Sequence, residues 1–170
     1  TGGPAAGPIV DATPDQFLQA FNQHLITNHL LTTTLMDGMK AEGYGRIINI
    51  ISTSVKVPLP NLGVSNTIRG AVASWAKTMS NELAQFGITV NNILPGMTRT
   101  QRLDSIVNNA VQKTNKSVKE VEKEMQDEIP AKRFGEAAEL AAVAAFLASP
   151  AASYVTGESI RVDGGRTGSI

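Results

Sequence analysis

The stretch Arg46-Ile47-Ile48-Asn49-Ile50-Ile51 decides the fold class of this 170-residue chain. Four of its six residues are isoleucine, and such a β-branched, almost wholly apolar run is typical of a parallel strand whose two faces are both covered. We therefore predict a buried parallel strand here. Parallel strands are joined through crossover segments, usually helices, so helix and strand are expected to alternate on either side of it.

A long helix is predicted immediately before this strand. Thr13 can cap its start, Pro14 suits the first helical position, and Gln16 stands where a capping box needs it. The helix is expected to end near Gly43. Apolar residues mark one face along it: Phe17, Phe21, Leu25, Leu35 and Met39.

The sequence after the strand repeats the pattern twice. A loop punctuated by Pro58, Pro60 and Gly63 leads into a segment with apolar residues at three- and four-residue spacing, which predicts an amphipathic helix. Pro95-Gly96 then closes a second apolar run. The predicted elements are a helix at residues 65–86, a strand at 88–94, a helix at 136–148 and a strand at 159–163.

This order predicts an α/β fold, a Rossmann-like three-layer αβα arrangement with three parallel strands. Three strands are few for an open sheet, and the first would leave a bare edge, which natural folds usually cover. We therefore expect residues 1–170 to form one partial domain, the C-terminal part of a doubly wound sheet. The polar segment 97–135 contains one predicted short helix, which begins with a capping box of Ser117 and Glu120.

The composition excludes several classes of function. Fifteen Lys and Arg balance fifteen Asp and Glu, so no basic excess is available to bind nucleic acid. The absence of cysteine excludes disulfides, thiolate zinc sites and a cysteine nucleophile, and it fits a reducing, cytoplasmic location. No apolar run approaches the roughly 18–20 residues of a membrane span, so no membrane partner is expected.

Several strings resemble the short-chain dehydrogenase/reductase superfamily, close to its 3-oxoacyl-[acyl-carrier-protein] reductase-like branch. They are residues 45–50 (Gly-Arg-Ile-Ile-Asn-Ile), residues 87–91 (Gly-Ile-Thr-Val-Asn), Pro95-Gly96 with Thr100, and the closing segment 146–165. The resemblance implies an oxidoreductase that uses NAD or NADP on a small-molecule carbonyl or hydroxyl substrate. It also implies a homodimer or homotetramer built through the long helices, which would place Trp75 in the core or at the dimer contact.

The dinucleotide phosphate-binding half of this family is not matched. No G-x-x-x-G-x-G follows a strand, and Thr1-Gly2 would fit the tail of the family's Asn-Asn-Ala-Gly motif. We expect the sequence to be a fragment of a longer protein, the alternative being a separate N-terminal piece that pairs with it. Without that half the chain is expected to be inactive by itself, because nothing in it would hold a pyrophosphate.

The resemblance also locates four catalytic positions. The family's tyrosine position falls on Ser65, its lysine position on Arg69, its asparagine position on His24, and its serine position on Ser52, thirteen residues before Ser65. Only Ser52 matches. Ser65 and Arg69 keep the i, i+4 spacing, so a hydroxyl and a guanidinium can project together.

The replacements change the expected chemistry. Ser65 is a poor acid, whereas Arg69 keeps a fixed charge and a planar fork that could bind ribose hydroxyls. His24 is the group that titrates near neutrality, and we hypothesise that it donates the proton, directly or through water. A structural role for Ser52, Arg69 and His24 is the alternative. His29 is five residues beyond His24 and off its i+4 face, so no metal pair is expected.

Further cofactor contacts are expected after the second strand, at the carboxyl edge where ligands of parallel sheets bind. The resemblance assigns the nicotinamide contacts to Pro95, Gly96, Thr98 and Thr100, and it makes residues 101–130 a substrate lid, the alternative being a surface insertion. The rival function is a catalytically silent binding or assembly subunit, because three of the four catalytic positions differ. A serine hydrolase built on Ser52 is disfavoured, since no G-x-S-x-G elbow surrounds it.

Overall fold

A computed structural model describes residues 3–169 and contains the predicted parallel sheet of three strands. The strands are β1 (Gly45–Ile50), β2 (Ile88–Pro95) and β3 (Ser159–Val162), in the spatial order β1-β2-β3. Gly45 pairs with Ile88 at the start of the β1–β2 ladder, and Asn92 pairs with Ser159 at the start of the β2–β3 ladder. The α/β prediction and the three strand positions are confirmed.

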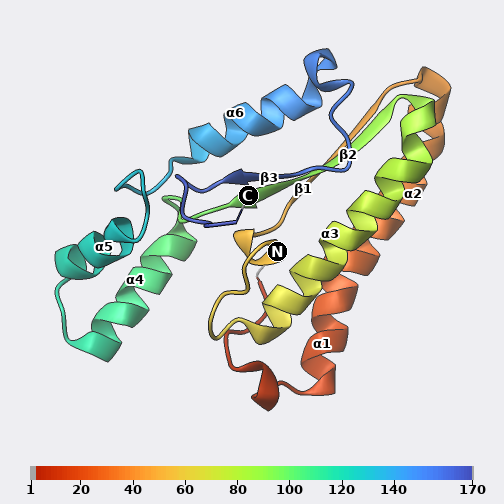
Figure 1. Cartoon of the computed structure of the whole chain (residues 1–170). Coiled ribbons are helices and arrows are strands. Elements are labelled where there is room, and N and C mark those ends of the chain that lie inside the picture. The colour runs from red at the N-terminus through yellow and green to blue at the C-terminus, as the bar shows by residue number, and fades with distance from the viewer. Residues whose placement is uncertain (1–2, 170) are drawn as a thin grey trace.

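Helices cover both faces of the sheet (Figure 1). Helices α2 (Thr27–Glu42) and α3 (Gly63–Leu83) lie on one face, and α6 (Ala137–Ala148) lies on the other. The central strand is buried throughout residues 88–94, as a strand between two helical layers must be. The predicted three-layer αβα arrangement is confirmed, and Trp75 packs at the edge of the core between α3 and the sheet.

The predicted long helix contains an interruption. It begins as α1 (Pro14–Phe21) with the expected Thr13 capping box, passes through a π-helical turn, η2 (Asn22–Ile26), and continues as α2 to its cap at Gly43. A π-turn adds a residue to the helical repeat and shifts the face that follows. After the turn, Leu35, expected on the same face as Phe17, is exposed to solvent and Thr32 is buried instead. Phe21, which precedes the turn, is also exposed, contrary to the prediction.

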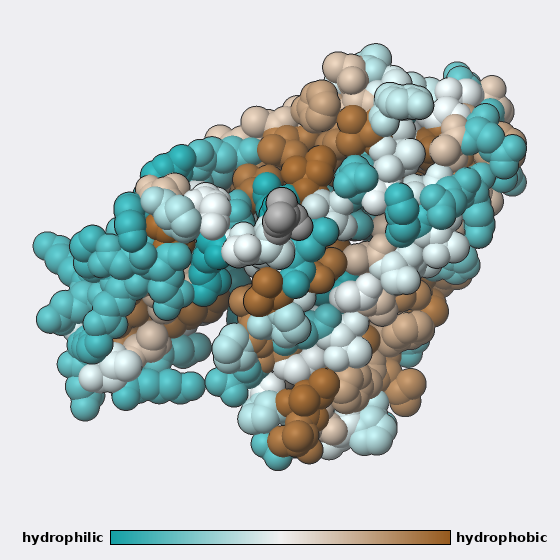
Figure 2. Space-filling model, viewed as in Figure 1, coloured by the Kyte–Doolittle hydropathy of each residue, from teal (hydrophilic) through white to brown (hydrophobic). Residues whose placement is uncertain are grey.

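The polar segment after β2 forms two helices rather than one. Helix α5 (Val118–Asp127) has the predicted Ser117 capping box, but α4 (Gln101–Thr114) was not predicted. The two helices pack on each other and project away from the sheet, with a largely hydrophilic outer surface (Figures 1 and 2). They share a small core of Leu103, Val107, Val121, Ile129 and Phe134.

Buried amides tie the three strands together. The Asn49 Nδ2 donates to Asn92 Oδ1 at 3.0 Å across β1 and β2, and the Asn92 Nδ2 donates to Ser159 Oγ at 3.1 Å across β2 and β3. Since buried polar groups are costly unless paired, this chain of amides favours one register of the sheet.

The remaining elements are short: η1 (Ile9–Asp11), η3 (Thr53–Val55), η4 (Ala84–Phe86) and η5 (Pro150–Ala152). Among residues 3–169, no helix is both long and apolar enough to span a membrane.

Candidate active site

Two of the predicted parts of the site, Ser52 and the segment from Pro95 to Thr100, lie at the carboxyl ends of strands. Because β1 and β2 run parallel, with Ile50 opposite Ile93, Ser52 after β1 and Pro95 at the end of β2 meet at the same edge of the sheet. This is the edge at which open α/β sheets bind their ligands.

Ser52 presents an uncommitted hydroxyl proton at this edge. Its backbone is extended, and its Oγ accepts a hydrogen bond from the Ser54 N–H at 3.1 Å, which caps the η3 turn. Because the oxygen is the acceptor in that bond, the hydroxyl hydrogen remains available to donate. Ser54 itself is buried, and its Oγ has no hydrogen-bond partner among the residues described.

Ser65 and Arg69 occupy successive turns at the start of α3, as their spacing predicts. Both are partly buried. Within residues 3–169 the Arg69 guanidinium forms no ion pair with a carboxylate, and burial lowers the pKa of Arg69. An arginine held partly away from water without an acidic partner is unusual in a structural role.

His24 lies in the π-helical turn η2, with only 6% of its surface exposed. In the described part of the chain its Nε2 has no hydrogen-bond partner. Burial, and then the nearby positive charge of Arg69, lower the pKa of His24 below its ordinary value of 6.5. Single π-turns in helices occur frequently at functional sites.

Helix α3 packs against the elements that carry or follow the other candidates. Both η2, which carries His24, and η3, which follows Ser52, contact α3. His24 also lies within electrostatic reach of Arg69. We treat His24, Ser52, Ser65 and Arg69 as one candidate set, which we call the SSHR cluster.

The four predicted cofactor residues on β2 and its loop are placed at the same edge, but their polar groups have local partners. The Gly96 N–H donates to the Val162 carbonyl at 2.9 Å. The Thr98 hydroxyl donates to the Gly96 carbonyl at 3.3 Å, and the Thr100 hydroxyl caps α4 by accepting from the Leu103 N–H at 3.4 Å. Pro95 ends the strand itself. These contacts shape the loop that leads into α4.

A cavity of about 310 Å³ is lined by residues of α1, η2 and the start of α3. Gln16, Gln19 and Gln23 line it from α1 and η2, opposite residues 3–5 and Val64. Gln23 and Val64 are the chain neighbours of His24 and Ser65. This cavity was not predicted from the sequence. The glutamine spacing of three and four residues does indicate that these side chains share one helix face.

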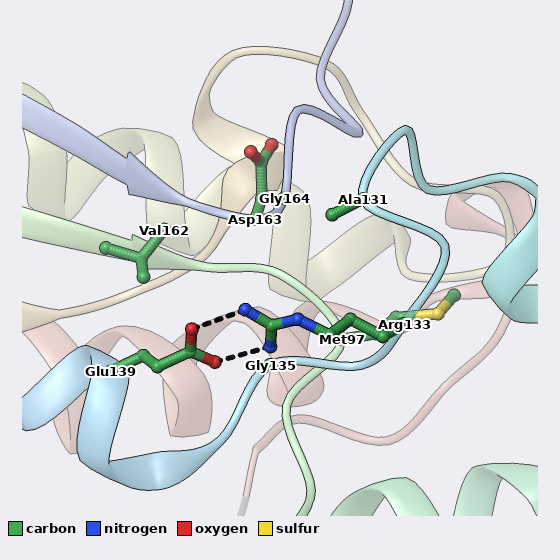
Figure 3. A pocket seen from close by; sticks show the side chains of 8 residues that line it. All are labelled: Met97, Ala131, Arg133, Gly135, Glu139, Val162, Asp163 and Gly164. Atoms are coloured by element: carbon green, nitrogen blue, oxygen red, sulfur yellow. Dashed lines mark hydrogen bonds and ion pairs between the residues drawn. The ribbon is translucent and has the colours of Figure 1, made fainter.

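A second, smaller cavity of about 80 Å³ lies where the loop between α5 and α6 meets the ends of β2 and β3. Figure 3 shows Arg133 facing Glu139 through two hydrogen bonds, at 2.7 and 2.6 Å, while Asp163 points away from them. The Arg133 guanidinium lowers the pKa of Glu139 to about 2. This ion pair anchors the loop between α5 and α6.

No tyrosine replaces Ser65. The Tyr44 hydroxyl is at the amino end of the sheet, where it donates to the Ala148 carbonyl at 2.7 Å, and Tyr154 is fully exposed. Tyr44 precedes β1 and therefore lies at the end of the sheet opposite Ser52. Thr1-Gly2, matched to the family's Asn-Asn-Ala-Gly tail, lies outside the residues described. Within residues 3–169 there is no metal-ligand cluster, and His29 Nδ1 accepts from Trp75 Nε1 at 3.4 Å.

Comparison with protein families and curated proteins shows that this chain is similar to reductases. The family model described as enoyl-(acyl carrier protein) reductase matches residues 2–167. The chain is 42% identical over 132 residues to the NADPH-dependent reductase BacG of Bacillus subtilis, covering 78% of this chain and 51% of that protein. It is 35% identical over 137 residues to the 3-oxoacyl-[acyl-carrier-protein] reductase FabG of Vibrio cholerae, covering 79% and 51%. The chain thus spans about half the length of these curated relatives.

Solved structures give the same result. The structure of YwfH, an NADPH-dependent reductase involved in bacilysin biosynthesis, superposes with a TM-score of 0.94 and 34% identity, covering all of this chain and 65% of that one. L-Sorbose reductase from Gluconobacter frateurii, complexed with NADPH and L-sorbose, superposes with a TM-score of 0.92 and 28% identity, covering 99% and 65%.

Proposed function

Because the chain belongs to the short-chain dehydrogenase/reductase superfamily, we propose that it is the substrate-side part of an NAD(P)(H)-dependent oxidoreductase acting on a carbonyl or hydroxyl group. The observation that supports the proposal is the proximity of His24 on η2 to Arg69 on α3, with Ser52 beyond the carboxyl end of β1. The 3-oxoacyl compounds processed by one relative are the first substrates to test.

The cluster fits a nicotinamide cofactor on its ribose side. The Arg69 guanidinium has no acidic partner in the part of the chain described, so its N–H donors remain for ribose hydroxyls. We assign contacts near the carboxamide to the segment that holds Pro95, Gly96, Thr98 and Thr100. Bound there in its reduced form, the cofactor supplies the hydride.

The chain's own residues handle the substrate oxygen and the proton. The free Ser52 hydroxyl hydrogen donates to the carbonyl oxygen and polarises it. Ser65 adds a second hydroxyl but cannot act as an acid near neutral pH, and Arg69 stabilises negative charge as it develops. His24 delivers the proton, directly or through water, because its Nε2 is uncommitted.

We also propose a substrate lid and a homo-oligomeric assembly. Helices α4 and α5, within the predicted lid 101–130, would cover the substrate and exclude water. Exposed apolar residues on α1 and α2 support a homodimer or homotetramer built on these helices: Leu18, Leu30, Leu31 and Leu35. Figure 2 shows this hydrophobic surface along the α1–α2 side. We place the protein in the cytoplasm.

A further proposal concerns how residues 1–170 relate to the complete protein. We propose that residues 1–170 are one partial domain, either a fragment of a longer chain or a piece that pairs with a separate N-terminal segment. The intact mass of the protein purified from its natural source distinguishes these, since a mass of 18.0 kDa would contradict the fragment.

A catalytically silent subunit is the second candidate, favoured by the replacement of the family's tyrosine by Ser65. One experiment separates the two: titrate the natural full-length protein with NADH and NADPH, then offer 3-oxoacyl and small ketone substrates. Turnover supports the oxidoreductase. Cofactor binding without turnover on a broad panel supports the silent subunit, and binding of neither cofactor contradicts both.

A further inference from the structure

The SSHR cluster contains hydrogen-bond donors and a positive charge, but it contains no carboxylate side chain. The Arg69 guanidinium is partly buried without a carboxylate partner, and burial is the one influence on its pKa that the structure reveals. His24 is more than nine-tenths buried with an orphaned Nε2. Because burying an uncompensated charge is costly, such a pair is typical of a site whose missing negative charge comes with a ligand.

The two serines complete an array of donors. The Ser52 hydroxyl hydrogen is free, since its oxygen accepts from Ser54 N–H. The Ser65 side chain, one helical turn before Arg69, makes no hydrogen bond to any other residue among those described. Two hydroxyls, one guanidinium and one imidazole therefore lie on α3, or on or beside elements that pack against it, with no carboxylate among them.

We propose that the SSHR cluster binds the carboxylate of a 2-oxo acid and that the adjacent carbonyl is the group reduced. This inference rests on the oxidoreductase proposed above and names its substrate class. A planar carboxylate matches the fork of Arg69 through two parallel hydrogen bonds, which a neutral ketone cannot form. The guanidinium has five N–H donors, so one edge can hold the carboxylate while another meets a ribose hydroxyl.

The proposed reaction adds a hydride and a proton to the carbonyl group. The carbonyl carbon accepts a hydride from the reduced nicotinamide, and the π pair of the C=O bond moves to the oxygen, which takes one proton from His24. The products are a 2-hydroxy acid and the oxidised nicotinamide, and His24 regains its proton from water. The bound carboxylate offsets the positive charge of Arg69 and therefore raises the pKa of His24. The imidazole is then protonated and can donate this proton to the substrate oxygen.

Binding is tested without turnover by using oxamate, an unreactive analogue of a 2-oxo acid, and its neutral ethyl ester. In NMR titrations of the natural full-length protein, oxamate should shift the imidazole signals of His24 and raise its pKa, whereas ethyl oxamate should not. The His29 signals in the same spectra reveal any general effect. Equal responses to the acid and the ester, or displacement of oxamate by inorganic phosphate at equal concentration, would overturn the assignment.

Turnover gives an independent test. The kcat/KM for pyruvate should exceed that for methyl pyruvate by about 10- to 100-fold, the size expected of a charge-assisted hydrogen-bond pair. In Arg69→Gln this ratio should fall toward about one, because loss of a ribose contact affects both substrates equally. Lys77→Gln, which removes an exposed positive charge farther along α3, should keep the wild-type ratio. Two outcomes would contradict the 2-oxo acid proposal while still supporting the oxidoreductase proposal. One is equal reduction of pyruvate and methyl pyruvate by the wild type. The other is reduction of 3-oxoacyl and small ketone substrates but not of pyruvate. Failure of the whole panel overturns both.

Discussion

His24 lies within electrostatic reach of Arg69, and burial, followed by that positive charge, holds the pKa of His24 below 6.5. The two residues come from different elements, the π-turn η2 and helix α3, which pack together. At neutral pH the imidazole is therefore uncharged in the free protein, and a proton-donating role requires a bound group that raises its pKa again.

Stability should depend on His24 as the pH falls below about 6.5. The folded-state pKa of His24 is lowered, so the unfolded chain binds the proton more readily. Stability is therefore complete above 6.5 and falls as the pH drops toward the folded-state value. We expect denaturant unfolding of His24→Asn and His24→Gln to show a weaker loss of stability from pH 7 to pH 5 than the wild type. Identical pH dependence in all three proteins would contradict the burial of His24.

Gly96 should be intolerant of a side chain for a packing reason. A Cβ at this position would lie 2.6 Å from the Cα of Asp163, where the ends of β2 and β3 meet. We expect Gly96→Ala to lower the free energy of unfolding by about 1–3 kcal/mol. Gly38→Ala in α2 is the matched control, since its Cβ meets nothing within 4 Å, and it should stabilise by up to about 1 kcal/mol. Chemical denaturation measures both.

Asn91 should be essential for holding β3. Its fully buried side chain donates to the Val155 carbonyl at 2.7 Å and accepts from the Glu158 N–H at 3.1 Å. Asn91→Leu leaves both backbone groups unpaired, at about 1–3 kcal/mol for each. We expect a clearly lower melting temperature, whereas Asn108→Leu, on the exposed face of α4, should change it little. A melting temperature of Asn91→Leu equal to that of the wild type would refute this role.

The 170-residue chain by itself should not bind a dinucleotide measurably. Its sequence contains no glycine-rich turn after a strand to hold a pyrophosphate. Calorimetric titration with NADH and NADPH should therefore give no heat of binding. A tight complex would show that residues elsewhere in the chain replace the phosphate loop.

The regular elements were predictable because their signals are local. The isoleucine run of β1 and the capping boxes at Thr13 and Ser117 specify structure within a few residues, and they are confirmed. The π-turn η2 was not predicted. It contacts α3, which is distant in sequence, and no local pattern reports such a contact. Consequently the exposure of Leu35 was predicted wrongly. Helix α4 had a signal that was missed, the Thr100 cap followed by Leu103 and Val107 at four-residue spacing.

The site was predictable in part. The i, i+4 spacing of Ser65 and Arg69 follows from sequence, and the family resemblance selected Ser52 and His24. The proximity of His24 to Arg69 and the free proton of Ser52 depend on how η2 and η3 pack on α3, which no local pattern encodes. The catalytic and cofactor roles of these residues remain predictions.

Deuterium transfer tests the central claim most directly. Full-length protein would be supplied with reduced nicotinamide cofactors deuterated at C4 and with a panel of 2-oxo acids, 3-oxoacyl compounds and ketones, and the products analysed by mass spectrometry. Our account predicts one deuterium on the new carbinol carbon of at least one product, with a large loss of label in His24→Asn. Cofactor binding with no deuterated product from any compound would contradict it and identify a protein that has kept the fold of a reductase without its chemistry.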